Sequence, residues 1–263
     1  MEPSNKTLYI PLYGKALVSR MGILLHDISA EEIWRSEHFH LRGKARSKWL
    51  AYFMGMRAAV IDQWTASQLT RFPEATVLHL GCGLDARFLR VEKAFSQWFD
   101  VDMPDVISVR RQYFAQTEEY HMLEADVTQG GWLEQIPPVQ TAIVVMEGLS
   151  MYLPMEQLKL LLGRIQQRFP RVLLILDTYT QFGVKASKYS NPIQTVGAGV
   201  VTGVDDPHIL ELNGKIRFTQ QLSMTPEEKI SELPREDQGF FRTMFAGKAT
   251  ELIYRLYTYE LTQ

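Results

Sequence analysis

The feature that most constrains the fold is a repeated alternation of short apolar runs with helical patterns. The apolar runs lie at 76–80, 98–102, 122–125, 141–146 and 171–176. Between them, apolar residues recur at three- and four-residue spacings, as in 84–89 and 155–169, and Pro104 stands where a helix would begin. Nearly continuous apolar strands separated by helices indicate parallel strands that are covered on both faces. The sequence therefore predicts an α/β fold with a doubly wound sheet.

The two ends of the chain depart from this alternation. The N-terminal part shows no convincing strand, and its apolar residues follow helical spacing at 30–34 and 45–69. Near the other end, 215–224 and 253–259 alternate like strands, with a helical pattern at 238–246 between them. We therefore expect a seven-stranded sheet with an antiparallel last strand and a helical N-terminal extension.

This organisation predicts two regions that fold as one cooperative unit. Residues 1–72 would form a helical cover over a substrate site, and residues 73–263 would form the ligand-binding core. The segment 179–203 contains several Gly, Ser and Thr residues and little periodicity, which predicts a long loop. Loops of this length are often functional lids.

Composition excludes several classes of protein. The 263 residues carry 28 Lys+Arg against 30 Asp+Glu, a net charge of -2, so no global basic field favours nucleic acid. The single cysteine, Cys82, allows neither an internal disulfide nor a multi-thiolate metal site, and we expect no bound metal. The chain begins without a secretory pattern and contains no apolar stretch long enough to cross a membrane. We expect a cytoplasmic protein.

A glycine-rich turn follows the first apolar run and reads Leu80-Gly81-Cys82-Gly83-Leu84-Asp85-Ala86. Glycines at such a turn let the backbone approach a ligand, and the following helix presents free N–H groups. The spacing also satisfies the dinucleotide fingerprint, with Asp102 near the distance expected of a ribose-binding acid. The motif alone leaves NAD, S-adenosylmethionine and a turn without a ligand open.

Acidic residues follow three successive predicted strands: Asp102, Asp126 and Glu147. The carboxyl ends of the strands are where an open α/β sheet holds its ligand. A ribose diol needs a carboxylate acceptor, and a cationic methionyl end tolerates nearby negative charge. These acids, and the long segment before the first strand, favour S-adenosylmethionine over NAD. The alternative is that each acid only caps the next helix.

The sequence resembles the leucine carboxyl methyltransferase family, especially its bacterial branch, which includes the tetracenomycin-type polyketide O-methyltransferases. The principal similar segments are Leu80–Arg87, Phe99–Pro104, Ala125–Asp126 and Glu147–Leu153. Further similar segments are Leu12–Ala16, Met56–Arg57, Ile61–Asp62 and Gly203–Pro207. The resemblance spans nearly the whole sequence, and it implies the class I methyltransferase fold, which is Rossmann-like, with S-adenosylmethionine as the methyl donor.

The resemblance also implies roles for residues near the methionyl end of the donor. Arg57 would bind the methionyl carboxylate, since the guanidinium fork matches two oxygens. Lys15 would match a family lysine that helps to hold the donor, and Glu147 would lie beside the donor near the methyl group.

Other residues are implied to hold the nucleoside part of the donor. Gly81 and Gly83 would line the donor in the glycine-rich turn, Asp102 would bind the ribose hydroxyls, and Asp126 with Val127 would contact the adenine. No residue is assigned as a catalytic base.

We therefore interpret the chain as an S-adenosylmethionine-dependent O-methyltransferase. Its acceptor is expected to be a small natural-product-like molecule, and the resemblance favours a carboxylate over a hydroxyl. A carboxylate is already ionised at neutral pH, whereas a hydroxyl needs a base. The alternatives are a protein C-terminal carboxyl methyltransferase, a catalytically silent S-adenosylmethionine-binding protein and an NAD-dependent reductase.

Overall fold

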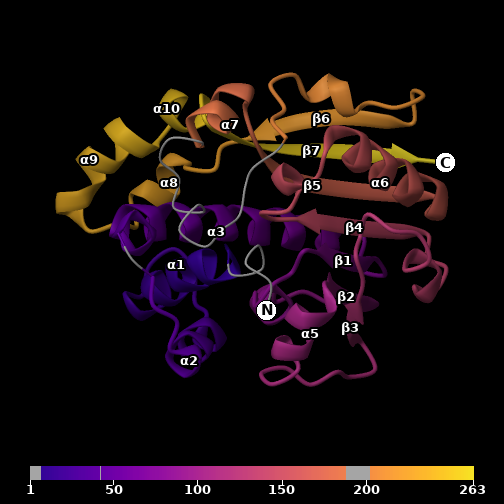
Figure 1. Cartoon of the computed structure of the whole chain (residues 1–263), viewed down its shortest axis with the longest axis horizontal. Coiled ribbons are helices and arrows are strands. Elements are labelled where there is room, and N and C mark those ends of the chain that lie inside the picture. The colour runs from indigo at the N-terminus through magenta and orange to yellow at the C-terminus, as the bar shows by residue number, and fades with distance from the viewer. Residues whose placement is uncertain (1–6, 42, 188–201) are drawn as a thin grey trace.

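A seven-stranded mixed sheet forms the centre of the molecule (Figure 1). The computed structural model describes residues 7–41, 43–187 and 202–263. The strands are β1 (Thr76–Leu80), β2 (Gln97–Asp102), β3 (Tyr120–Glu124), β4 (Thr141–Met146), β5 (Arg171–Tyr179), β6 (Ile216–Leu222) and β7 (Tyr254–Thr262). Their order is β3-β2-β1-β4-β5-β7-β6, and β7 runs antiparallel to both of its neighbours. The predicted doubly wound sheet with an antiparallel last strand is confirmed.

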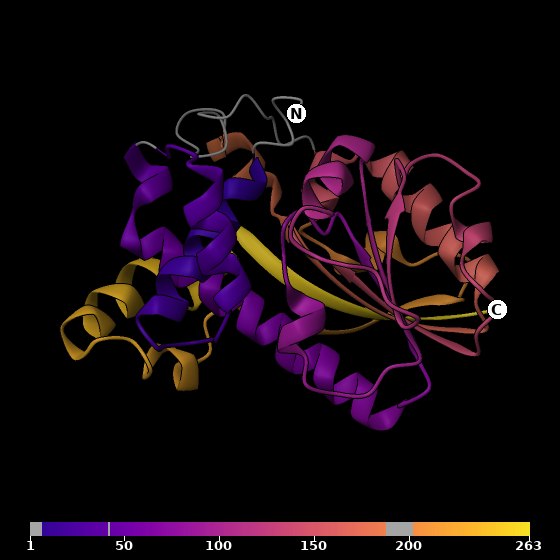
Figure 2. The same cartoon turned by 90° about the horizontal axis from the view of Figure 1, so that it is seen from below.

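Side chains of the central strands alternate between two apolar layers. On one face, Val77 and Ile143 pack with residues of α3 (Lys48–Arg71). On the other face, Leu78 and Val144 pack with α6 (Met155–Arg168). Figure 2 shows these two helices on opposite sides of the sheet. Both faces of the parallel strands are therefore covered, which explains their nearly continuous apolar sequence.

The N-terminal region is helical, as predicted. It contains α1 (Tyr9–Arg20), α2 (Ile28–Glu37), a 3₁₀ turn (Gly43–Arg46) and α3. Ser47 caps α3, its side chain accepting a hydrogen bond from the amide of Trp49 at 3.3 Å. A Cβ atom at Gly14 would lie 2.7 Å from the Cβ of Met54, so only glycine permits this approach of α1 to α3.

A second helical segment joins this cover from the far end of the sequence. It comprises α8 (Glu227–Ile230), α9 (Arg235–Phe245) and α10 (Lys248–Glu251) and lies beside the N-terminal helices in Figures 1 and 2. Ile230, Leu233 and Phe241 pack with residues of α1 and α3. Asp237 bonds Lys48 at 2.8 Å and Tyr52 at 2.9 Å. The cover thus includes α8–α10, which the sequence analysis assigned to the core. Cooperative folding of the two regions as one unit stays a prediction.

The structure corrects two local predictions. The helix expected over 84–89 is a single turn, α4 (Arg87–Arg90), because the preceding residues are used in the glycine-rich turn. Part of the loop expected over 179–203 is the helix α7 (Gln181–Ser187), and residues 188–201 lie outside the described residues, so the lid stays a prediction.

The remaining short elements are one predicted helix and three turns that were not predicted. They are α5 (Pro104–Arg110) and the 3₁₀ turns Leu133–Gln135, Ser150–Tyr152 and Pro207–Leu210. Pro104 occupies the first turn of α5, as expected. Among the described residues, no helix is both long and apolar enough to cross a membrane.

Candidate functional site

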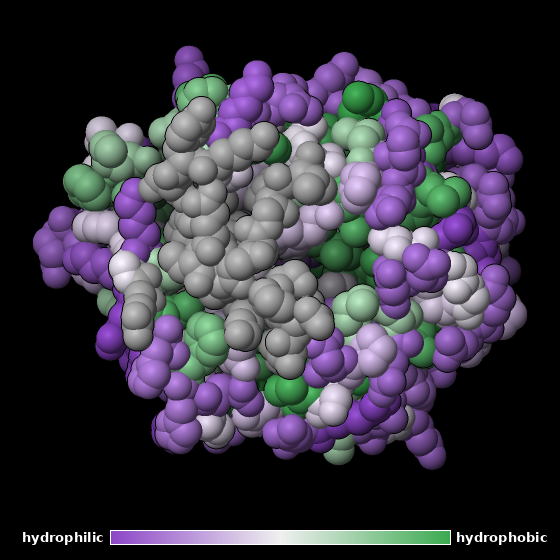
Figure 3. Space-filling view, in the orientation of Figure 1, coloured by the Kyte–Doolittle hydropathy of each residue, from purple (hydrophilic) through white to green (hydrophobic). Residues whose placement is uncertain are grey.

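A cavity of about 710 Å³ lies where the carboxyl ends of β1, β2 and β4 meet the helical cover. Its walls combine the glycine-rich turn, the ends of these strands and side chains of α1, α3, α9 and α10. In the space-filling view of Figure 3, apolar side chains lie in a recess of the surface. This edge of the sheet is where open α/β folds bind their ligands.

The glycine-rich turn is hydrogen-bonded to β2 beside the cavity. Gly81 and Gly83 have φ angles of +67° and +53°, a conformation in which a side chain is strained. The amide of Gly81 donates to the carbonyl of Val101 at 2.8 Å, and the amide of Gly83 donates to the Asp102 carboxylate at 2.7 Å. A Cβ atom at Gly81 would also lie only 3.1 Å from the Cβ of Leu149. At Gly81 and Gly83 the turn therefore presents bare backbone.

Asp102 retains hydrogen-bonding capacity toward the cavity. Its Oδ2 accepts from the Gly83 amide, and its Oδ1 accepts from the Met103 amide at 2.8 Å. Because each carboxylate oxygen has two lone pairs, one acceptor position remains on each oxygen. Burial raises the pKa of Asp102 to about 6, against the lowering effect of the two backbone bonds. At neutral pH the group is ionised and able to accept from a diol.

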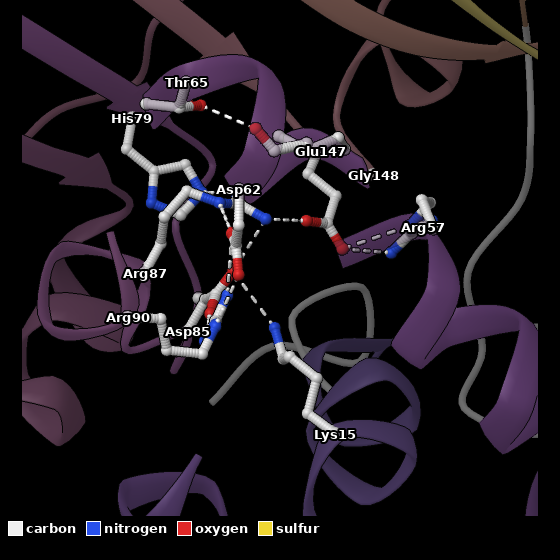
Figure 4. A network of polar contacts seen from close by, with 12 residues as sticks. Lys15, Arg57, Asp62, Thr65, His79, Asp85, Arg87, Arg90, Glu147 and Gly148 are labelled. Atoms are coloured by element: carbon white, nitrogen blue, oxygen red, sulfur yellow. Dashed lines mark hydrogen bonds and ion pairs between the residues drawn. The ribbon is translucent and has the colours of Figure 1, made fainter. Parts of the chain in front are cut away.

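Glu147 is held between two buried arginines (Figure 4). Arg57 bonds its Oε1 through Nε at 3.1 Å and through Nη2 at 2.8 Å, and Arg87 bonds its Oε2. Burial by itself would raise the pKa of Glu147, but Arg57 and Arg87 hold it well below its usual range. Glu147 is therefore a fixed anion and a poor proton acceptor.

Lys15 reaches the cavity from α1. Its Nζ lies 3.1 Å from Asp85 Oδ2, and Asp85 also contacts Arg87 at 3.3 Å and Arg90 at 2.6 Å. Burial opposes ionisation of Asp85, but Arg90, Lys15 and Arg87 hold its pKa well below the usual range. Figure 4 shows Lys15 pointing toward this cluster. The cover and the glycine-rich turn are thus joined by buried charges.

Asp177, on β5, does not line the cavity but holds Arg57, which does, and the sequence prediction did not select it. Its Oδ2 lies 3.0 Å from Arg57 Nη1 and accepts from the Tyr254 hydroxyl at 2.6 Å. Its Oδ1 accepts from the Gly148 amide at 2.7 Å. The signal that could have found it is the one used for the other acids, because Asp177 lies near the end of a predicted strand.

The structure brings six of the eight candidate residues to the cavity. The lining includes Lys15, Arg57, Gly81, Gly83, Asp102 and Glu147. Asp126 and Val127 are not among the residues that line it.

Asp126 and Val127 follow β3, close in sequence to the point where the Ala125 amide bonds the carbonyl of Asp102 at 2.9 Å. The side chain of Asp126 accepts from Thr128, and that of Val127 is buried in the apolar layer on the α6 side of the sheet. Their contact with adenine stays a prediction.

No group of three or more His, Cys, Asp or Glu side chains suited to a metal ion occurs in the described part of the chain. The single cysteine, Cys82, is buried, and burial raises the pKa of its thiol well above the usual value. It is therefore not a reactive nucleophile.

The chain matches a known protein family over more than half of its length. The family model for leucine carboxyl methyltransferase matches residues 3–166. The tetracenomycin polyketide synthesis O-methyltransferase of Streptomyces glaucescens is 33% identical over 226 residues, which are 84% of this chain and 83% of that protein. An S-adenosylmethionine-dependent methyltransferase of Gibberella zeae is 27% identical over 214 residues, 76% of this chain and 69% of that protein.

Solved structures share the fold at low sequence identity. Magnesium protoporphyrin IX methyltransferase from Synechocystis PCC 6803, with bound S-adenosylhomocysteine, superposes with a TM-score of 0.53 at 12% identity, covering 89% of this chain and 95% of that chain. The same enzyme with bound S-adenosylmethionine gives a TM-score of 0.51 at 11% identity, covering 89% and 92%. The fold is that of class I methyltransferases.

Proposed function

Because the chain belongs to the leucine carboxyl methyltransferase family and uses S-adenosylmethionine, we propose that it methylates a carboxylate oxygen of a small, largely apolar molecule. Two features support this proposal: an apolar wall beside the donor-binding turn, and a lining in which the side chains of Glu147 and His79 are already engaged.

The residues around the glycine-rich turn fit the donor. The turn presents bare backbone at Gly81 and Gly83, and Asp102 has free acceptor positions for the ribose hydroxyls. Arg57 and Lys15 line the same cavity as cations suited to a methionyl carboxylate. When bound, S-adenosylmethionine supplies an electrophilic methyl group on a positively charged sulfur.

The rest of the wall is apolar and aromatic. Side chains that line it from the cover and the strand ends include Leu50, Phe53, Met54, Tyr152, Tyr179, Met244, Phe245, Ile253 and Tyr254. Such a surface favours a small apolar molecule and strips water from a polar group brought into it. A desolvated carboxylate is a stronger nucleophile, and the cavity wall would orient it.

The observation that carries the choice of acceptor is that, apart from Asp102, which we assign to the ribose hydroxyls, the described lining offers no matched general base. Glu147 is held by arginines that keep its pKa low. His79 Nε2 lies 3.0 Å from Arg87 Nη1, so it accepts there, and its Nδ1 then donates to Asp100 at 3.2 Å. Both ring nitrogens are engaged, and burial lowers the pKa of His79. An acceptor that arrives ionised needs no base, whereas a hydroxyl does.

The test is methyl transfer from labelled S-adenosylmethionine to small aromatic acids that carry both a carboxyl and a hydroxyl group, such as hydroxynaphthoic acids. Label that alkali releases supports carboxylate methylation. Alkali-stable label on the hydroxyl refutes it, because that product is an ether. Each acid is paired with its own methyl ester, which leaves only the hydroxyl available and is expected to accept no label.

The same assay separates the alternatives. Transfer to peptides with a free C-terminus, but to no small acid, would identify a protein carboxyl methyltransferase. Binding of S-adenosylmethionine without transfer to any of these acceptors would support a silent binding protein.

A second experiment tests the proposed donor site. Arg57→Lys keeps a positive charge but loses the guanidinium fork, and we expect calorimetry to show weaker binding of S-adenosylmethionine. Arg111→Lys, at an exposed ion pair with Glu124, is the matched control and should bind normally. Unchanged affinity of the Arg57 variant would contradict the proposed role.

A further inference from the structure

A network of ion pairs that adjoins the proposed donor site contains more carboxylates than cations. Its cations are Lys15, Arg57, Arg87 and Arg90, and its carboxylates are Asp27, Asp62, Asp85, Glu147 and Asp177, all joined by ion pairs. The adjoining pair Arg110 and Asp100 is balanced, and His79 adds no charge because its Nε2 accepts a hydrogen bond from Arg87. Among the described residues, this network therefore has one carboxylate in excess.

Asp177 and Asp27 are the two carboxylates of this network that pair with a single arginine, and only the arginine of Asp177, Arg57, lines the cavity. Asp177 shares Arg57 with Glu147, whereas Glu147 also pairs with Arg87. The other partners of Asp177, the Tyr254 hydroxyl and the Gly148 amide, are neutral. The Asp177 side chain is 0% exposed, so water does not compensate it. Burial raises the pKa of Asp177 above its ordinary value even though Arg57 opposes this.

The two ligands of a methyltransferase differ by one charge. S-adenosylmethionine carries a sulfonium, an ammonium and a carboxylate, a net charge of +1, whereas S-adenosylhomocysteine has lost the sulfonium charge and is neutral. An uncompensated buried anion is costly, so a cationic ligand brought beside the network relieves a cost that a neutral ligand leaves in place.

We propose that Asp177 is a specificity-determining residue of the donor site, whose buried carboxylate favours the cationic S-adenosylmethionine over the neutral S-adenosylhomocysteine. The proposal rests on the donor position argued above, in which Arg57 and Glu147 lie beside the methionyl end. It also provides a physical reason for product release, because methyl transfer removes the charge that Asp177 attracts.

The test compares the dissociation constants of both ligands by calorimetry at about pH 8, above the ordinary range of carboxyl pKa values. The wild-type protein should bind S-adenosylmethionine at least several-fold more tightly than S-adenosylhomocysteine. Asp177→Asn, which keeps the shape and removes the charge, should lower this preference by about tenfold, mainly through weaker binding of S-adenosylmethionine. Glu134→Gln removes an exposed charge and should leave the preference unchanged.

Tyr254→Phe distinguishes charge from structure, because it removes a hydrogen bond to Asp177 but keeps the carboxylate. It should shift both affinities together and preserve their ratio. An unchanged ratio in Asp177→Asn overturns the proposal. If that variant does not fold, the wild-type protein still decides, since equal or tighter binding of S-adenosylhomocysteine also overturns it.

This outcome is distinguishable from a failure of the proposed function. The measurement needs no methyl acceptor, so it is independent of the acceptor's chemistry. If Arg57→Lys leaves the binding of S-adenosylmethionine unchanged, the donor position is wrong. If Arg57→Lys weakens binding while Asp177→Asn preserves the ratio, only the role of Asp177 is wrong.

Discussion

Replacing Asp102 with asparagine should stabilise the ligand-free protein at neutral pH while weakening donor binding. The reason is that the folded protein ionises a carboxyl group whose pKa burial has raised to about 6. The asparagine side chain would carry no charge, and its oxygen could still accept from the Gly83 amide. The bond from the Met103 amide would be lost. Stability and function therefore oppose each other at this residue.

The magnitude follows from the pKa. A rise from 3.8 to about 6 costs about 3 kcal/mol at neutral pH, at ~1.36 kcal/mol for each pKa unit. Half-burial leaves some solvent screening, which reduces the cost to about 2 kcal/mol. Loss of the Met103 bond removes about 1 kcal/mol, so the net stabilisation should be about 1 kcal/mol.

The pH dependence gives a sharper signature. Between the unfolded pKa of 3.8 and the folded pKa of about 6, the folded wild-type protein binds more protons at Asp102 than the unfolded chain does. Its stability therefore falls as pH rises through this window. The stability advantage of Asp102→Asn should shrink by roughly 1–2 kcal/mol between about pH 7.5 and about pH 4.5, because the cost of ionising Asp102 in the wild-type protein falls over this range. The cost of the lost hydrogen bond does not depend on pH.

Urea unfolding of both proteins at the two pH values measures these differences, and calorimetry measures donor binding. We expect S-adenosylmethionine to bind Asp102→Asn more weakly by about 1–3 kcal/mol, because a charged acceptor is lost. A difference in stability that stays constant with pH would refute the ionisation argument. A destabilised variant with unchanged donor affinity would refute both parts.

Three further changes test other parts of the structure. Gly81→Ala should cost about 1–2 kcal/mol of unfolding free energy in urea titrations, since its φ of +67° disfavours a side chain; a neutral result would mean that the turn relaxes freely. Arg87→Met should lower stability by about 3–5 kcal/mol because Glu147 loses a buried partner, and a melting temperature equal to the wild type would contradict this. Phe241→Ala should lower the free energy of unfolding by about 3–5 kcal/mol because it leaves a cavity between α9 and the N-terminal helices. A much smaller loss in calorimetric melting would contradict this and would mean that the helices collapse into the cavity.

Most of the sheet was predictable because its signals are local. The run Thr76–Leu80 is β1 and the run Thr141–Met146 is β4, with identical bounds. The helix predicted over 155–169 differs from α6 by one residue. Such runs are easy to recognise because a strand buried on both faces is apolar at most positions. The predictions that were wrong lie at 84–89 and 181–187, where turn geometry and packing outweigh periodicity.

The site was predictable where its residues belong to a strand end or a turn. Gly81, Asp102 and Glu147 were selected for this reason, and they line the cavity. The sequence contains no comparable local signal for Tyr254, which lines the cavity from β7. Its hydroxyl donates a hydrogen bond to Asp177 on the neighbouring strand β5. Pairing between side chains far apart in the chain depends on strand order, and no single segment of the sequence predicts the strand order.

The alternation of strands and helices, the glycine-rich turn and the acids at the strand ends could be predicted from the sequence, because each depends on periodicity or backbone conformation over a few residues. The pairing of the charges depends on the tertiary structure. Arg57 meets Glu147 and Asp177, and the helices α8–α10 complete the cover over the cavity. Burial makes this decisive, since the same charges in water would interact weakly, whereas in a dry network one unmatched carboxylate influences which ligand binds.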